Sequence, residues 1–220
     1  MEYFNSDKYQ SSVSVLIVYF QFFRSIAMQF SLKRAHLSAA SCIIGLVLFA
    51  SCSEETSTPA PTPTPSLYDR VGGITMVSDP SNPATMIEKG RLTLRSVVDS
   101  SILVIAADPK MAKYFPVLFA ELGAGNTTGL SRLSKNFTDF MCLATGSKTY
   151  TYSGLDMKAA HDPAKNSRIP MKITAADFDA FVGNIGVGLA KNGVTAANNA
   201  QLVNDLVALL NTTKADIVQQ

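Results

Sequence analysis

Cysteine and histidine are scarce in this chain, and tryptophan is absent. The 220 residues include three cysteines and two histidines. The sequence has no Cys-x-x-Cys pair, no paired histidines and no Gly-x-x-x-x-Gly-Lys-Ser/Thr motif, which excludes the common zinc sites and the phosphate-binding P-loop. Beyond Cys52 the chain has a single histidine, His161, and a single cysteine, Cys142, so this part forms no internal disulfide. A Ser-His-Asp triad would have to use the same His161.

An excess of charge of one sign is also missing. From Ser53 to the C-terminus, acidic and basic residues are equal in number, so the formal net charge of +2 belongs to the N-terminal segment. A balanced body without a basic stripe has no electrostatic basis for binding a polyanion. We therefore expect no nucleic-acid partner.

The N-terminal segment has the pattern of an export signal. After Met28, basic residues at 33–36 precede an apolar run at 37–50, which has the length of a signal h-region and is short for a membrane span. The run leads into Leu48-Phe-Ala-Ser-Cys52, which resembles the bacterial lipobox. This resemblance implies lipidation of Cys52 and a location in the bacterial cell envelope, anchored to a membrane and facing the periplasm or the exterior. A plain signal peptide or an N-terminal anchor is the alternative.

Composition divides the chain into three parts. Residues 1–52 form an N-terminal extension and lipoprotein signal, whose true start is Met1 or Met28. Residues 53–66 are rich in Pro and Thr, and alternating Pro keeps a backbone extended, so we expect a stiff tether. Residues 67–220 hold enough apolar residues for one folded domain, in which Cys142 is expected to fill the core.

Apolar periodicity predicts that this domain is all-α. Apolar residues recur three and four positions apart at 130–144, 178–189 and 202–210, as one face of a helix requires. The segment Leu94–Ala107 is rich in Val and Ile, but neighbouring hairpin signals are missing, which favours a helix over a strand. Three polar residues of the first stretch are expected away from its apolar face: Asn136, Thr138 and Asp139.

Local signals mark the ends of these helices. Gly146 is placed to stop the first helix, and Gly193 to stop the second. The sequence Thr174-Ala-Ala-Asp177 has the capping-box pattern that opens a helix, and Thr195 opens the last one.

Several short motifs occur in the order in which truncated hemoglobins carry them. They are Leu67-Tyr-Asp-Arg-Val-Gly-Gly73, Ala107-Asp-Pro109 followed by Tyr114-Phe115, Leu143-Ala-Thr-Gly146, the string Tyr152-x-Gly-x-x-Met-x-x-x-His161, and Asp216-Ile-Val218. The chain resembles group I of this family over residues 67–218. The resemblance implies a two-over-two helical sandwich that encloses one heme b.

The same resemblance assigns residues to the heme. His161 becomes the proximal ligand of the iron, since neutral imidazole is a good ligand for heme iron. Met157 is expected to pack on the porphyrin from the same helical face, and Phe115 to stack on it. Tyr152 resembles the tyrosine near a heme propionate, and a solvent-facing or capping role is equally open. Two further residues of the 130–144 face are expected to contact the cofactor: Phe140 and Met141.

On the distal side, opposite His161, this chain departs from its relatives. Ile102 stands where the group carries a tyrosine that donates a hydrogen bond to the bound gas. Leu133 and Phe137 take the ligand-facing positions of the next helix, and relatives often have a glutamine at the second. We therefore expect an apolar distal pocket, for which Tyr114 or a residue of the 74–96 insertion remains a candidate donor.

Two insertions also depart from the family pattern. Residues 74–96 replace a short bridge and include an extra helical turn expected at 86–94. A further extension follows His161, at 162–170. Long loops cost little closure entropy, so both are compatible with the fold.

These observations favour a tethered heme protein that reversibly binds diatomic gases, O2, NO or CO. A polar donor stabilises bound O2 more than bound CO or NO, so the apolar pocket predicts a bias toward the latter two. Two alternatives stay open. One is a globin-shaped interaction or structural module that has lost heme. The other is a heme enzyme, an NO dioxygenase or weak peroxidase, which requires a reductase partner.

Overall fold

The computed structural model describes residues 64–220. The predicted signal, its lipidation site Cys52, the choice of start and nearly all of the tether lie outside these residues. None of the helices formed by residues 64–220 combines the length and the hydropathy that a bilayer crossing requires.

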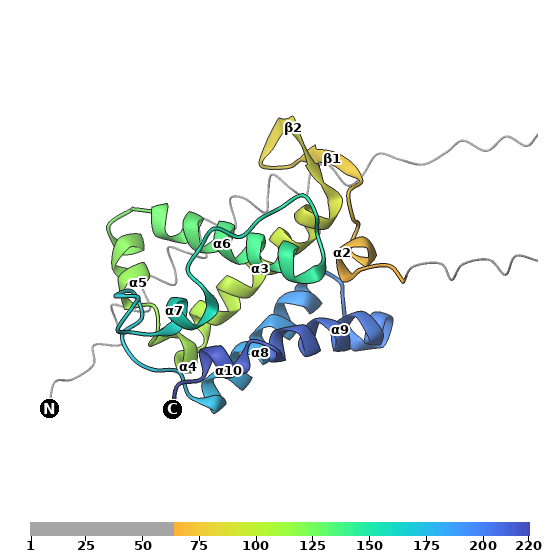
Figure 1. Ribbon diagram of the computed structural model, residues 1–220. Helices are drawn as coiled ribbons and strands as arrows, with labels where there is room; N and C mark the ends of the chain where they lie inside the picture. The colour runs from red at the N-terminus through yellow and green to blue at the C-terminus, as the bar shows by residue number, and fades with distance from the viewer. Residues whose placement is uncertain (1–63) are drawn as a thin grey trace, which may run out of the picture.

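Helices dominate the described chain (Figure 1). In order the elements are α2 (Leu67–Arg70), β1 (Met76–Asp79), β2 (Asn82–Glu88), α3 (Lys89–Ala107), α4 (Pro109–Ala112), α5 (Pro116–Gly123), α6 (Thr128–Thr145), α7 (Met157–His161), α8 (Ala175–Lys191), α9 (Ala196–Asn211) and α10 (Lys214–Ile217).

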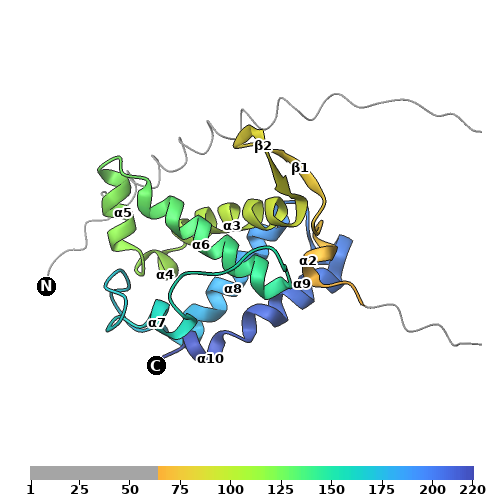
Figure 2. The ribbon, with the colours of Figure 1, turned by 45° about the horizontal axis from the view of Figure 1, so that its top comes forward.

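The four longest helices form two layers. In one layer α3 packs against α6, and in the other α8 packs against α9, with α3 also crossing α8. Figures 1 and 2 show α6 and α3 lying over α8 and α9, with the short helix α7 at the edge between them. The predicted all-α, two-over-two arrangement is confirmed for these helices.

The predicted helix ends are confirmed. Thr174 caps α8 by accepting a hydrogen bond from the backbone N–H of Asp177, and Thr195 caps α9. Gly146 ends α6 with a φ of 104°, and Gly193 follows α8 with a φ of 78°, backbone angles that a side chain would strain.

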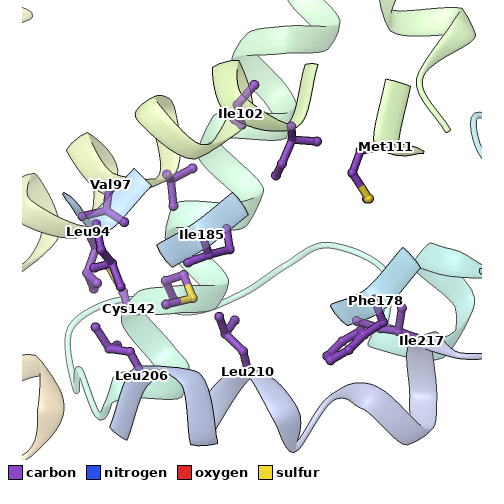
Figure 3. Packing of buried hydrophobic residues seen from close by; sticks show 14 of the residues in the cluster. Leu94, Val97, Ile102, Met111, Cys142, Phe178, Ile185, Leu206, Leu210 and Ile217 are labelled. Carbon is purple, nitrogen blue, oxygen red and sulfur yellow. The ribbon is translucent and has the colours of Figure 1, made fainter. Parts of the chain in front are cut away.

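The core lies where the two layers meet. Figure 3 shows side chains of α3, α6, α8 and α9 pointing toward one another, and Cys142 of α6 is fully buried among them, as predicted. The labelled members are Leu94, Val97, Ile102, Met111, Cys142, Phe178, Ile185, Leu206, Leu210 and Ile217.

The 74–96 insertion contains a β-hairpin, so the helical turn expected at 86–94 is found only at 89–94 and is corrected at 86–88. Strands β1 and β2 are antiparallel, with Val77 opposite Ile87. Ile87 is buried, and Glu88 accepts a hydrogen bond of 2.6 Å from the hydroxyl of buried Tyr68. Strand pairing and this anchor fix 86–88 as extended chain, and the helix starts at Lys89 as part of α3.

The polar side of α6 is also buried at Thr138 and Asp139, which the sequence placed away from the apolar face of this helix. Both residues are at most 5 % exposed. The carboxylate of Asp139 lies 2.7 Å from the guanidinium of Arg91 on α3 and 2.6 Å from the ammonium of Lys135. The reason is that α3 covers this side of α6 and provides the partner for its charge.

Candidate functional site

A cavity of about 730 Å³ lies between α3, α5, α6, α7 and α8, partly closed by the loop after α7. This volume falls in the range of pockets that bury a small organic cofactor. Its walls are mainly aromatic and aliphatic, and polar residues from α6 and from the loop complete them. The arrangement suits a flat apolar body that has a polar edge.

His161 is the last residue of α7 and lines this cavity. The helix is short and begins at a cap, where the side chain of Asp156 accepts a hydrogen bond from the backbone N–H of Ala159. Nδ1 of His161 lies 2.8 Å from the carbonyl oxygen of Met157. A carbonyl can only accept, so Nδ1 carries the proton and donates it, which leaves the lone pair of Nε2 available.

The imidazole is kept neutral. Burial lowers the pKa of His161 below its usual 6.5, and the hydrogen bond to the Met157 carbonyl opposes this only in part. A neutral ring whose orientation is fixed by a backbone carbonyl is the form in which histidine binds a metal.

The lowered pKa of His161 predicts a stability loss in mild acid. The unfolded chain binds a proton at this residue more readily than the folded chain, so the free energy of unfolding should fall as the pH drops below about 6.5. Urea unfolding of the protein without added ligand at pH 7.5, 6.5 and 5.5 measures this, and His161→Asn should flatten the dependence. Equal slopes for both proteins would contradict it. The carboxylates of Asp79 and Asp177, with pKa values of about 2, act only in stronger acid.

The cavity brings together all but one of the predicted contact residues. The predicted residues that line the cavity are Ile102, Phe115, Leu133, Phe137, Phe140, Tyr152, Met157 and His161.

Met141 is the exception, because it packs in the core at 4 % exposure and does not line the cavity. The next position along an α-helix is turned by about 100°. Phe140 therefore faces the cavity while Met141 faces the layer interface.

The ring of Tyr152 lines the cavity, and its hydroxyl forms a hydrogen bond within its own loop. The hydroxyl donates to the carbonyl oxygen of Leu155 at 2.7 Å. The ring meets Phe140 edge to face, with the centroids 6.1 Å apart. This hydrogen bond holds Tyr152 within the loop before α7, a contact that the sequence did not predict.

The predicted distal residues Ile102, Leu133 and Phe137 present apolar groups to the cavity. Tyr114 also lines it, but its hydroxyl donates to the carboxylate of Asp177 at 2.7 Å. Burial and this hydrogen bond raise the pKa of Tyr114. Its proton is thus committed to Asp177, and Tyr114 does not serve as the donor that the sequence left open.

Sequence periodicity missed the polar residues of the cavity. Asn136, expected away from the apolar face of α6, lines the cavity, and so does Arg132 one turn earlier. Lys165 and Arg168 come from the 162–170 extension. Apolar spacing does not mark such positions, because a polar residue at the border of an apolar face belongs to neither side of the pattern.

Two contacts fasten the extension to the cavity wall. The side-chain amide of Asn166 donates to the carbonyl oxygen of Ala160 on α7 at 2.7 Å. Both terminal nitrogens of Arg168 lie 2.7 Å from the two carboxylate oxygens of Glu121 on α5, forming a bidentate pair. The extension is therefore part of the site.

A metal ion could also bind directly to side chains, without an organic cofactor. Residues 64–220 contain no group of three or more His, Cys, Asp or Glu side chains able to hold such an ion. A site with one imidazole suits a metal that brings its other ligands with it, as heme iron does.

Comparisons with known proteins yield one kind of match. No family model matches the chain, and no curated protein matches it. Among solved structures, it is similar to a mutant truncated hemoglobin from Tetrahymena pyriformis in its Fe(III) form, at 20% sequence identity and a TM-score of 0.47. The match covers 71% of this chain and 100% of that one. A likeness at this level carries no functional conclusion.

Proposed function

We propose that this protein is a heme-binding globin that reversibly binds diatomic gases. The observation that carries the proposal is His161, which lines an aromatic cavity of about 730 Å³ and has Nδ1 bonded to a carbonyl and Nε2 free. Heme, when bound, supplies an iron that takes one ligand from the protein and one small guest molecule.

The residues of the cavity have separable tasks in this proposal. Met157 fixes the imidazole through its carbonyl, and burial keeps the ring neutral. Phe115 and Phe140 supply flat apolar contact for a porphyrin. Ile102 and Phe137 exclude water and offer the gas no charge or donor. These features favour binding of a guest over its chemical conversion, which requires stabilised charge.

Anchoring through Cys52 belongs to the same proposal and rests on the sequence pattern alone. Mass spectrometry of the mature N-terminus tests it, since a lipidated Cys52 would be the first residue.

Titration of the full chain with hemin tests heme binding. We expect a sharpened and shifted Soret band for the unaltered protein, and a loss of about tenfold or more in affinity for His161→Ala, together with a changed band. Lys191→Gln, a control at an exposed lysine in the last turn of α8, should bind as the unaltered protein does. Equal spectra and affinities for all three proteins would contradict ligation by His161, and no heme uptake by any of them would favour a module that has lost heme.

A further inference from the structure

The hairpin between α2 and α3 carries an exposed apolar face. The ladder places Ser78 opposite Met86 and two residues after Met76. Opposite residues and alternate residues share one face of a hairpin, so Met76 and Met86 are neighbours on the same face. Met76 is 52% exposed and Met86 is 59% exposed, and Ile74, just before β1, is 70% exposed. Single exposed apolar side chains are ordinary, but three of them on one hairpin mark a contact surface.

The other face of the hairpin is turned toward the protein. Val77 stands opposite Ile87, whose side chain is 7% exposed. The hydroxyl of buried Tyr68 donates to Glu88 and fixes the end of β2. Figures 1 and 2 show the hairpin projecting beyond the helices. The face that bears Met76 and Met86, called the methionine face below, is therefore presented outward by strands that are held in place.

The hairpin and the first residue of α3 carry three charges, of which one is left without a counter-charge. Asp79 is paired with Arg95 of α3 through two contacts of 2.6 and 3.0 Å. Glu88 is buried and accepts its hydrogen bond from Tyr68. Lys89 is exposed, and in the described part of the chain no ion pair involves it. An apolar face next to a free positive charge suits the headgroup region of an anionic lipid bilayer.

The chain that leads to the proposed anchor ends beside this hairpin. Thr64, the first described residue, follows Cys52 by twelve residues, and an extended chain spans at most about 3.6 Å per residue, so the two lie within about 43 Å of each other. Four residues after Thr64, Tyr68 of α2 is bonded to Glu88 at the end of β2. An anchor on Cys52 therefore brings the hairpin end of the domain to the bilayer, which makes lipid the occupant that fits the methionine face.

We propose that the methionine face docks on the lipid bilayer that holds the anchor. The inference rests on the anchoring part of the proposed function and adds a second contact, which orients the domain. Stable attachment to a bilayer generally takes two such signals. Ile102, the first residue of α3 to line the cavity, follows Lys89 by thirteen residues, or about 20 Å of helix, so the docked domain keeps its cavity away from the lipid.

Tryptophan fluorescence tests this contact, because the chain contains no tryptophan of its own. Met86→Trp places one reporter on the methionine face, and Val187→Trp places one at an exposed apolar residue of α8. The neighbour of Val187, Gly188, packs against Ser101, which lies about 18 Å along α3 from its first residue, so this control is remote from the hairpin. Each full chain is mixed with vesicles of phosphatidylethanolamine and phosphatidylglycerol, with and without brominated acyl chains, and the bound fraction is collected by flotation.

The emission of Met86→Trp should shift to shorter wavelength on the vesicles and fall at least about twofold with brominated lipid, since an apolar face docked on a bilayer reaches about 5–10 Å into it. Val187→Trp should show neither change. Adding Met76→Glu to Met86→Trp should abolish both changes, because a carboxylate on the same face is costly to bring into lipid. Circular dichroism checks that each variant is folded.

The outcomes separate this inference from the proposed function. Equal emission of the two reporters on vesicles, or a chain that does not bind vesicles, overturns the docking. A blue shift of Met86→Trp that grows with protein concentration in the absence of lipid also overturns it and identifies a second copy of the chain as the occupant. A lipid-dependent change confined to Met86→Trp supports the docking. None of these measurements uses hemin, and mass spectrometry of Cys52 reports on the anchor separately.

Discussion

Phe137→Gln is expected to hold O2 about tenfold to a hundredfold more tightly than Phe137→Leu, with a much smaller difference for CO. Phe137 lines the cavity beside Leu133 and packs against Phe181, with ring centroids 6.1 Å apart. Both substitutions remove this ring contact, so their difference isolates the added amide donor. O2 becomes partly negative in its complex with ferrous heme, and a hydrogen bond to a charged partner contributes about 1.5–3 kcal/mol. Each 1.4 kcal/mol is a factor of ten.

Gas affinities of the ferrous proteins, measured by absorbance titration or from association and dissociation rates, test this prediction. Asn136 carries the one amide of α6 that lines the cavity, and it stands at the polar border with Arg132. Asn136→Leu should therefore change O2 affinity less than about twofold. A large loss of O2 affinity in this variant would show that Asn136 is a native donor and that the pocket is not apolar toward its guest.

Asp139→Ala is expected to destabilise the heme-free protein by about 3–5 kcal/mol. Asp139 has 6% side-chain exposure and lies 2.7 Å from Arg91, whose side chain is 16% exposed. Burial acts to raise the pKa of Asp139, but hydrogen bonds from Lys135 and Arg91 outweigh it, and the pKa is lowered. Removing the carboxylate leaves the Arg91 guanidinium buried without its counter-charge. Urea unfolding measures the difference.

Lys135→Ala is the matched control, because it removes the other partner of the same carboxylate. Its side chain is 62% exposed, so its loss should cost no more than about 1 kcal/mol. Equal effects of the two substitutions, or an Asp139→Ala protein as stable as the unaltered chain, would show that the pair with Arg91 contributes little.

Local sequence patterns were enough to predict most of the fold. The apolar spacing of α6, α8 and α9 and the helix-ending Gly146 and Gly193 act within a few residues, so the sequence alone predicts them. His161 was assigned from the family resemblance, and the cap that Asp156 provides for its short helix is a local signal that the sequence analysis did not use.

Features that depend on distant partners were not predictable. The turn at Pro80-Ser81 lacks the Asn-Gly type of signal, so the pairing of Val77 with Ile87 has no local mark. The burial of Asp139 could not be predicted, because its partner Arg91 lies on another helix. The polar residues of α6 and of the 162–170 extension line one cavity only after the chain has folded, so their spacing in the sequence does not mark them.

The proposed bond between heme iron and His161 is tested most directly by resonance Raman spectroscopy of the ferrous, heme-loaded chain with ¹⁵N-labelled histidine. The chain has two histidines, His36 and His161. We predict an iron–imidazole band that shifts with the label, persists in His36→Gln and disappears in His161→Gln. A band that survives His161→Gln, or one that does not respond to the label, would contradict the account.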